Sequence, residues 1–491
     1  MLSFNREKVK SAVLIVLVLS SIIQVGILWD YQSHRFPFNF ISKVFSSQSN
    51  NDKTDIVEIA RKDIFSPYRI TISNGNRTHW VIGKDDYIYN ELWDEACGYL
   101  EKVLTSGEGH SVNMNTWIDL TVKKSIMIEF KTGIKTGLLK WFLDITGSSS
   151  DYFDSIQKIF ILPYEDINNN NTVYIYSSKG LYRYIVPFNK KGMLKSGYTK
   201  TINNLEYNGN IVQYNTFKEI DPNNVISKKL QLSISPDILC VAEGIKYYKY
   251  PSAIYYDNRK TADIEEIARV ILGNEKESFD RYIENNAVVF KNINNTYRLY
   301  NDGLLEYKYI PGVDDQEKSD IGSAFEKAYI FISRIKKGYI DPETDLYLKQ
   351  VKDENQGYYE FIFDYKLGDL PVYINFQDKS GDKEPVKSAV SIKANGKRII
   401  ECRWYLASIE KSRTQSEYNI YFEDMLNEMS KKYGKQSFDN IEVKDITMAY
   451  LLNGGYDSKG IPPVWIIERS DGEYYFLQLA KKNSAVQQKD E

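Results

Sequence analysis

The sequence predicts an α+β fold carried by one N-terminal transmembrane helix, with serial domains that each combine a helix with antiparallel sheet. Short segments alternate apolar and polar residues, as half-buried strands do, and longer segments repeat apolar residues at helical spacing. Asp-Gly and Asn-Gly dipeptides separate pairs of strand-like segments, which is the pattern of tight hairpins. The chain also contains 39 tyrosines among 491 residues, and a tyrosine ring can cover half-exposed sheet while its hydroxyl stays in water.

The first half of the chain is predicted to form strands around one helix. Alternation predicts strands over 68–73, 78–83, 125–130, 158–164 and 172–178. A helical period over 85–104 places five apolar residues on one face: Ile88, Leu92, Ala96, Tyr99 and Val103. The asparagine run Asn168–Asn171 is expected to be a surface loop.

The second half contains a weak repeat of three units, each a helix followed by strands that form a hairpin. The helices are predicted over Asp263–Leu272, Asp320–Lys337 and about Glu417–Tyr433. A glycine follows each helix as its expected C-cap: Gly273, Gly338 and Gly434. The hairpins are expected to turn at Asp302-Gly303, Asn395-Gly396 and Asp471-Gly472. Each unit would pack one helix across one sheet face.

Residues Ser11–Trp29 carry no charge and are predicted to cross a membrane. A helix of this length spans roughly 28 Å, which is close to the hydrocarbon thickness of a bilayer. Arg6, Lys8 and Lys10 precede it, so the N-terminus is expected in the cytoplasm and the rest of the chain outside.

A cleaved signal peptide is the alternative interpretation of this segment, because its basic start and apolar run look similar. The apolar run is long, however, and bulky Ile27, Leu28 and Trp29 occupy the place of a small-residue cleavage site. We therefore expect an uncleaved, single-pass anchor.

Ser20, Ser21 and Gln24 are the clearly polar side chains of the anchor. Ser20 and Gln24 are four residues apart and share a helical face. Such groups hydrogen-bond across transmembrane helices, so these three residues are the predicted contact with a partner helix. The alternative is that Gln24 only reaches toward the outer headgroups.

The expected organisation has six parts. They are a cytoplasmic N-terminus (1–10), the transmembrane helix (11–29), a juxtamembrane linker (30–54), a first extracytoplasmic domain (55–235), a central α+β domain (236–315) and a C-terminal α+β domain (316–491). The linker contains the polar stretch Ser46–Thr54, which breaks both periodicities.

No motif for catalysis, phosphate binding or dinucleotide binding is present in the sequence. The nearest pattern, Gly107–Ser111, combines glycine, histidine and serine and is interpreted as a chance match. Three cysteines and three histidines supply few ligands for zinc, and Cys97, Cys240 and Cys402 are expected to be small buried hydrophobes. A net charge of −3 gives no general attraction to nucleic acid. We therefore expect a protein that is not an enzyme, with no catalytic residue, no metal, no cofactor and no small-molecule substrate.

The layout resembles the YycH family of Firmicutes. The basic N-terminus, the anchor ending in Leu28–Gln32 and the extracytoplasmic remainder match it. So do the strand patterns at Tyr358–Ile374 and Ser391–Leu406, and the last strands at Ile441–Leu452 and Pro463–Phe476. The first region is longer here and carries the asparagine-rich insert, so the local partner surface is not transferred.

The resemblance implies regulation of a two-component system that governs cell-wall metabolism. Family members act with a YycI-like protein on a sensor histidine kinase, WalK, through transmembrane and extracytoplasmic contacts. The family offers no catalytic residues to transfer to this chain. The residues alone leave two other classes open, which are an extracytoplasmic binding module for a cell-wall fragment or secreted protein, and an enzyme with an unfamiliar site.

Overall fold

The structure, a computed structural model, describes residues 59–482 except 61–63, 107–108, 146–152, 168–169, 188–194, 208–210, 231, 258–263, 273–278, 285, 302, 311–318, 340–343, 355–356, 376–387, 434–441 and 453–459. The predicted anchor with Ser20, Ser21 and Gln24 therefore lies outside the described residues, as do Gly273, Asp302 and Gly434. None of the helices within the described ranges is both long and apolar enough to cross a bilayer.

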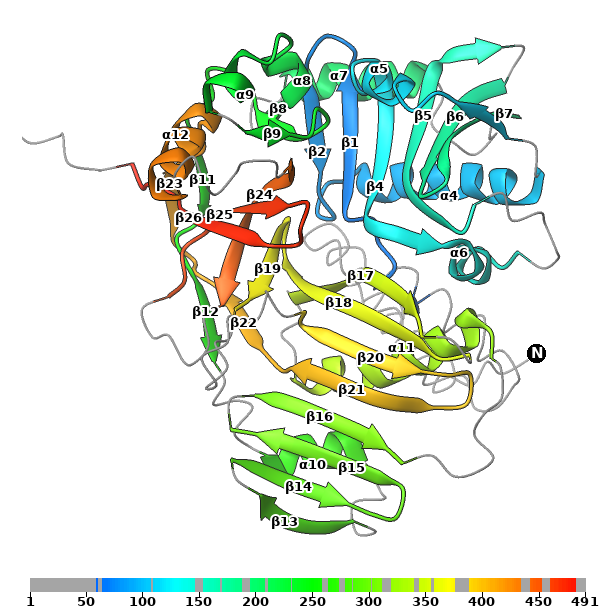
Figure 1. Ribbon diagram of the computed structural model, residues 1–491, viewed down its shortest axis with the longest axis vertical. Helices are drawn as coiled ribbons and strands as arrows, with labels where there is room; N and C mark the ends of the chain where they lie inside the picture. Colours follow the sequence, from blue (N-terminus) through cyan, green and yellow to red (C-terminus); the bar gives the residue numbers. More distant parts are fainter. Residues whose placement is uncertain are drawn as a thin grey trace, which may run out of the picture. The chain divides into compact units, whose positions relative to one another are not determined.

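The described chain has an α+β fold in which antiparallel sheet predominates (Figure 1). One sheet has nine described strands, each antiparallel to its neighbours. Their order is β10 (Leu239–Val241), β8 (Gln213–Thr216), β2 (His79–Ile82), β1 (Arg69–Asn74), β4 (Lys124–Lys135), β5 (Ser155–Ile167), β6 (Asn170–Ser177), β7 (Gly180–Pro187) and β3 (His110–Val112).

Alternation along these strands separates an apolar face from a mixed one. Ile72, Ile126, Ile161 and Val173 lie opposite one another on four adjacent strands and are fully or almost fully buried. Helix α4 (Tyr89–Ser106) contacts β4 and β7. It lies on the apolar face, because its Tyr99 hydroxyl accepts a hydrogen bond from the amide of Asn171, which shares a face of β6 with Val173. The opposite face carries the polar groups described below.

Four further helices flank the nine-stranded sheet. They are α5 (Thr116–Thr121), α7 (Lys195–Tyr207), α8 (Phe217–Ile220) and α9 (Val225–Leu230). Tyr198 joins α7 to the sheet, because its buried hydroxyl donates to the carbonyls of Ser73 (2.7 Å) and Ser125 (2.9 Å). A capping box at Thr216 begins α8, where Glu219 also accepts from His79 of β2 at 2.9 Å.

The second sheet has thirteen described strands. The main path is β13 (Asp280–Glu284), β14 (Ala287–Lys291), β15 (Asn295–Tyr300), β16 (Leu304–Tyr309), β21 (Ile399–Tyr405), β20 (Val390–Ala394), β18 (Tyr359–Leu367), β19 (Leu370–Ile374), β24 (Glu442–Leu452), β25 (Val464–Arg469) and β26 (Tyr474–Gln478). Beside this path, β17 (Thr344–Asp353) pairs with β18 and β9 (Ser233–Ile234) pairs with β24. Only the β19–β24 and β9–β24 pairings of these described strands are parallel.

Two ribbons run beside this sheet. One pairs β11 (Tyr247–Pro251) with β23 (Gln415–Asn419), and the other pairs β12 (Ile254–Asp257) with β22 (Ser408–Lys411). Strand pairing therefore crosses the two domain boundaries that the sequence predicts inside the folded region, after residues 235 and 315. β9 and the ribbons join residues before 258 to the C-terminal strands, and β16 pairs with β21.

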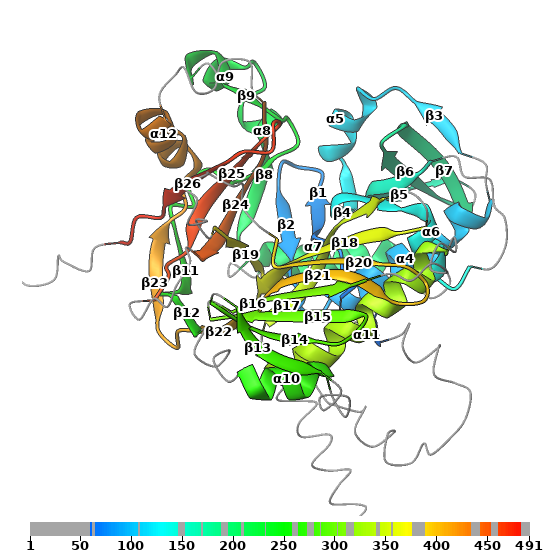
Figure 2. The same cartoon turned by 60° about the horizontal axis from the view of Figure 1, so that its bottom comes forward.

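Helices α10 (Ile264–Leu272) and α11 (Ile321–Tyr339) contact each other on one side of the thirteen-stranded sheet (Figure 2). Buried Phe325 and Ile332 of α11 face strands β18, β20 and β21. Beside this contact α11 also meets α6 (Thr136–Phe142), where a Cβ on Gly322 would clash with the Trp141 ring. Only glycine allows this approach of the two helices.

Each of the three predicted helices is followed by strands that form a hairpin, as expected, and the structure corrects the details. The third helix is α12 (Phe422–Tyr433), because residues 417–419 pair as part of β23 instead of starting the helix. Gly338 does not end its helix, since α11 continues to Tyr339. The units also do not pack separately, because the β16–β21 and β19–β24 pairings join their strands into one sheet.

The predicted asparagine loop is also wrong at its end. Asn171 lies inside β6 and is 2% exposed, because its amide hydrogen-bonds the hydroxyl of Tyr99. An amide is tolerated in a core when a partner of this kind satisfies it.

The contacts of the chain divide it into residues 1–56 and 57–491, so we expect the second part to fold alone. A fragment covering Asp52–Glu491 should be soluble and monomeric or weakly dimeric. Its melting temperature should not change with dithiothreitol, because none of the three cysteines, all within the described part, forms a disulfide. It should not change with EDTA either, because the described residues contain no group of three or more possible metal ligands. Differential scanning calorimetry tests this, and a loss of more than a few degrees in EDTA would reveal a structural metal.

Candidate functional site

A row of charged side chains crosses the mixed face of the nine-stranded sheet. Register places Arg69 of β1 opposite Glu129 of β4, and Glu129 opposite Lys158 of β5. The Glu129 carboxylate lies 3.6 Å from Nη1 of Arg69 and 3.0 Å from Nζ of Lys158. Opposite charges in neighbouring strands stabilise this register.

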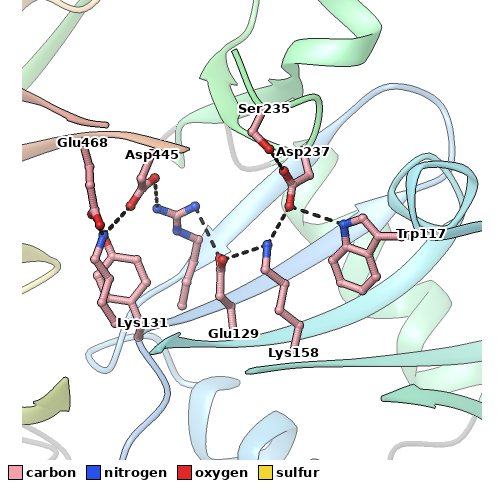
Figure 3. A network of polar contacts seen from close by, with 10 residues as sticks. Trp117, Glu129, Lys131, Lys158, Ser235, Asp237, Asp445 and Glu468 are labelled. Atoms are coloured by element: carbon pink, nitrogen blue, oxygen red, sulfur yellow. Dashed lines mark hydrogen bonds and ion pairs between the residues drawn. The ribbon is translucent and has the colours of Figure 1, made fainter. Parts of the chain in front are cut away.

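A second cluster on the thirteen-stranded sheet faces this row (Figure 3). Asp445 of β24 lies directly opposite Glu468 of β25, and like charges in this position repel each other. Lys131 of β4 compensates this repulsion, because its Nζ lies 2.8 Å from Oδ2 of Asp445 and 2.6 Å from Oε2 of Glu468. The Lys131 side chain is only 7% exposed, so this contact is made away from water.

Asp445 collects further donors from β1 and the residue before it. Arg69 Nη2 lies 3.4 Å from its Oδ1, and the Tyr68 hydroxyl donates to its Oδ2 at 3.2 Å. Burial favours the neutral acid, but the nearby charges of Lys131 and Arg69 hold the pKa of Asp445 well below its usual range. Burial opposes the charge of Lys131 as well, yet Asp445 raises the pKa of its ammonium.

Asp237, in the loop between β9 and β10, closes the other end of the row (Figure 3). Its carboxylate accepts from Nζ of Lys158 and Oγ of Ser235, both at 2.6 Å, and from Nε1 of Trp117 at 3.3 Å. Burial favours the neutral acid, but the charge of Lys158 and these hydrogen bonds lower the pKa of Asp237 to about 2. Lys158 also stacks over the Trp117 ring, with Nζ 5.2 Å from its centroid.

These side chains form what we call the junction network, because it connects strands of both sheets. It pairs Arg69, Lys131 and Lys158 with Glu129, Asp237, Asp445 and Glu468. General acid–base catalysis needs a pKa near the working pH. The pKa of Asp237 and Asp445 is lowered and that of Lys131 and Lys158 is raised, so these groups stay charged at neutral pH. The network therefore suits a structural contact that holds the two sheets together, and it does not suit proton transfer.

A cleft of about 310 Å³ lies beside the network and shares Tyr68 and Arg69 with it. Its walls come from both sheets and include Val81, Tyr214, Leu239, Leu370, Met448 and Trp465. The size and mostly apolar lining, with a few charged groups, are typical of small-molecule sites.

The charged groups of the cleft are Asp86, Lys366 and Asp369, in addition to Arg69. Burial raises the pKa of both aspartates and lowers the pKa of Lys366, while Lys366 and Asp369 oppose these shifts in each other. Perturbed groups that face one cleft are a mark of functional sites.

A second depression, of about 420 Å³, lies over strands β15, β16, β18, β20 and β21. Its lining alternates in charge across the strands, as in the register neighbours Lys308, Glu401, Lys393 and Glu360. The ion pairs Lys308–Glu401 (3.7 Å) and Lys352–Glu360 (2.9 Å) neutralise it from within. This face therefore resembles an ordinary solvated sheet surface.

The structure does not place the predicted contact residues Ser20, Ser21 and Gln24, which lie outside the described ranges. In the Gly107–Ser111 pattern, His110 and Ser111 are exposed on β3. Cys240 and Cys402 are buried as predicted, and Cys97 is only partly buried. Among the residues that the structure describes, no group of three or more possible ligands could hold a metal ion.

The junction network and the cleft were not predicted from the sequence. One signal for the network was present, because Arg69, Glu129, Lys131 and Lys158 occupy the polar positions of strands whose other positions are isoleucine or phenylalanine. Charges on the half-buried side of three strands indicate a polar contact on that side. The sequence contains no corresponding signal for Asp237, which lies in a loop.

Comparison with known proteins assigns no family. No family model matches the chain, and no curated protein matches it. One solved structure, described as an uncharacterized protein from Eubacterium rectale ATCC 33656, is 14% identical, with a TM-score of 0.27 over 50% of this chain and 88% of the other. A likeness at this level carries no argument about fold or function.

Replacing Lys131 by methionine should strongly destabilise the protein. The substitution leaves the half-buried carboxylates of Asp445 and Glu468 opposite each other without the cation that they share. Breaking a buried pair costs about 3–5 kcal/mol, and partial exposure places this loss at the lower end of that range. Urea denaturation measures the loss. The control is Lys431→Met, which removes a pair of similar length (2.7 Å to Glu428) between exposed side chains and should cause no measurable change. Equal behaviour of the two variants would contradict the role of burial.

Replacing Asp237 by asparagine should give a pH-dependent penalty. The folded pKa of about 2 lies below the ordinary value of 3.8, so the carboxylate stabilises the protein above pH 3.8 and loses this effect as the pH falls toward 2. The penalty in unfolding free energy should be about 2 kcal/mol at pH 6 and about half of that at pH 3.

Urea titrations at the two pH values measure this penalty. The control is Asp154→Asn, which breaks a surface pair with Lys179 and should behave alike at both pH values. A penalty for Asp237→Asn that is the same at pH 6 and pH 3 would show that the ionised carboxylate is not its cause.

Proposed function

We propose that this chain is a non-catalytic, membrane-anchored regulator that tunes a cell-wall-sensing histidine kinase of a two-component system. The observation that carries the proposal is the layout of the sequence. A charge-free run over 11–29 follows a basic N-terminus and precedes a large folded region, as in the YycH family. In this proposal the N-terminus is cytoplasmic, the folded region is extracellular, and the partners are a WalK-like kinase and a YycI-like protein.

The geometry of the folded region agrees with such a role. In the junction network each carboxylate is paired with a cation of the same network, and Asp237 and Asp445 retain their charges at neutral pH. A regulator that acts through contacts needs parts that move together, and a buried set of ion pairs between two sheets holds them in one arrangement. The same set offers no group poised for proton transfer.

A second candidate function is an extracytoplasmic binding module for a cell-wall fragment or a secreted protein. The cleft of about 310 Å³ favours it, because Asp86, Lys366 and Asp369 line it together with apolar side chains. The two functions are compatible, since a regulator can respond to a bound molecule.

The regulator proposal is tested in the anchor. The double substitution Ser20→Leu with Gln24→Leu should weaken association with the kinase and change transcription of its regulon, because an interhelical polar contact is worth about 1 to 2 kcal/mol in model peptides. A shift of this size changes a binding ratio about tenfold. A reporter for the regulon and a membrane two-hybrid assay measure the two effects.

The matched control is Val18→Leu with Ile22→Leu, which adds two leucines at the same spacing without removing a polar group. Alkaline phosphatase fused after Glu491 should be active in all three strains, which verifies that topology is unchanged. If the Ser20/Gln24 variant gives wild-type reporter expression and two-hybrid signal, the helix serves only as a tether. An inactive phosphatase fusion would contradict the predicted membrane anchor.

A further inference from the structure

Lys366, at the end of β18, differs from the neighbouring lysines because no carboxylate lies within ion-pair distance of its ammonium. Lys349 and Lys352 of the adjacent strand β17 reach Asp364 and Glu360 at 2.7 and 2.9 Å. Lys366 is partly buried in the wall of the cleft, and within the described ranges no carboxylate lies at ion-pair distance from it. Asp345 lies opposite it in the β17–β18 register, but that carboxylate pairs with Lys84 at 3.5 Å and Lys336 at 3.7 Å instead. A lysine held away from bulk water without a partner is costly unless a ligand supplies an anion.

Two carboxylates line the same cleft and gather around Gly83. Asp86 Oδ2 accepts from the Gly83 amide at 2.7 Å. Asp369, in the turn between β18 and β19, lies so close to Gly83 that a Cβ there would fall 1.9 Å from its Oδ1. The absence of a side chain at Gly83 therefore brings the end of β2 and this turn together, so that both acids line the cleft with Lys366.

We infer that the cleft binds a small zwitterion, a molecule of amino-acid or dipeptide size with one ammonium and one carboxylate. A simple anion would be attracted by Lys366 but repelled by Asp86 and Asp369. A simple amine would be attracted by the two aspartates but repelled by Lys366. A zwitterion gives Lys366 the carboxylate that it lacks and places its ammonium beside the two acids. Charge-assisted hydrogen bonds of this kind are stronger than neutral ones.

The remaining walls suit the rest of such a molecule. The volume of about 310 Å³ lies at the lower end of the range for small-molecule sites, about 300–1,000 Å³. Val81, Leu239 and Leu370 supply apolar surface. Tyr248 and Tyr250 also line the wall, and the centroids of their rings are 5.0 Å apart. These groups would cover a short aliphatic body between the two charged ends.

This inference rests on the second candidate function, the binding module, and is independent of the kinase. Its test is isothermal titration calorimetry of the full-length protein in detergent with alanyl-alanine, N-acetyl-alanyl-alanine and alanyl-alanine amide. Wild type should bind alanyl-alanine and bind each derivative about tenfold more weakly or worse, because each lacks one charge.

Single substitutions then assign each end of the ligand to its partner. Lys366→Met should weaken alanyl-alanine about tenfold and no longer discriminate against the amide, while it still discriminates against the acetylated form. Asp369→Asn should also weaken alanyl-alanine, but it should no longer discriminate against the acetylated form and should still discriminate against the amide. Lys200→Met, which removes an exposed lysine of α7, is the control and should bind as wild type.

Each outcome decides the inference. Unchanged binding by Lys366→Met, or equal binding of the three ligands by wild type, overturns it. If a soluble cell-wall digest raises the melting temperature of wild type but alanyl-alanine does not bind, the ligand class is wrong and the binding function stands. If neither alanyl-alanine nor the digest binds, both the zwitterion inference and the binding function are overturned. The comparison of ligands on wild type needs no substitution, so it decides even if a variant does not fold.

Discussion

The junction between the two sheets depends on one ammonium between two carboxylates. Asp445 and Glu468 lie opposite each other on β24 and β25, and this pairing would be unfavourable without a cation. Lys131 supplies it from a strand of the other sheet, at 2.8 and 2.6 Å. The C-terminal strands thus pair without repulsion only when the nine-stranded sheet is in place, so the two sheets stabilise each other.

The rest of the network extends this dependence across the nine-stranded sheet. Arg69, Glu129 and Lys158 carry alternating charge from β1 to β5, and Asp237 ends the row from a loop that precedes β10. Thr132 of β4 adds a neutral contact nearby, because its hydroxyl donates to the carbonyl of Lys349 at 2.5 Å. Buried pairs of this kind are costly to form and still more costly to break singly, which favours one arrangement of the sheets over others.

The two candidate functions use different parts of this architecture. Regulation of a kinase through contacts needs the anchor and a folded region that keeps its shape. Ligand binding needs the cleft, whose walls come from both sheets and would separate if the junction opened. The shared residues Tyr68 and Arg69 connect the cleft to the network, so occupancy of the cleft and strength of the junction are expected to be coupled.

The sequence by itself determined the fold class, the amphipathic faces of α4, α10, α11 and α12, and the hairpins near Gly303 and Gly472, because these features depend on local periodicity and turn chemistry. Even there, tertiary contacts moved details, as when residues 417–419 joined β11 as a strand. Only the tertiary structure decided that the three repeat units share one sheet. It also placed Asp237, Asp445 and Lys131 together and left Lys366 without a carboxylate at ion-pair distance, because these relations join residues hundreds of positions apart. No local pattern encodes such distances, since register and loop closure set them only when the whole chain folds.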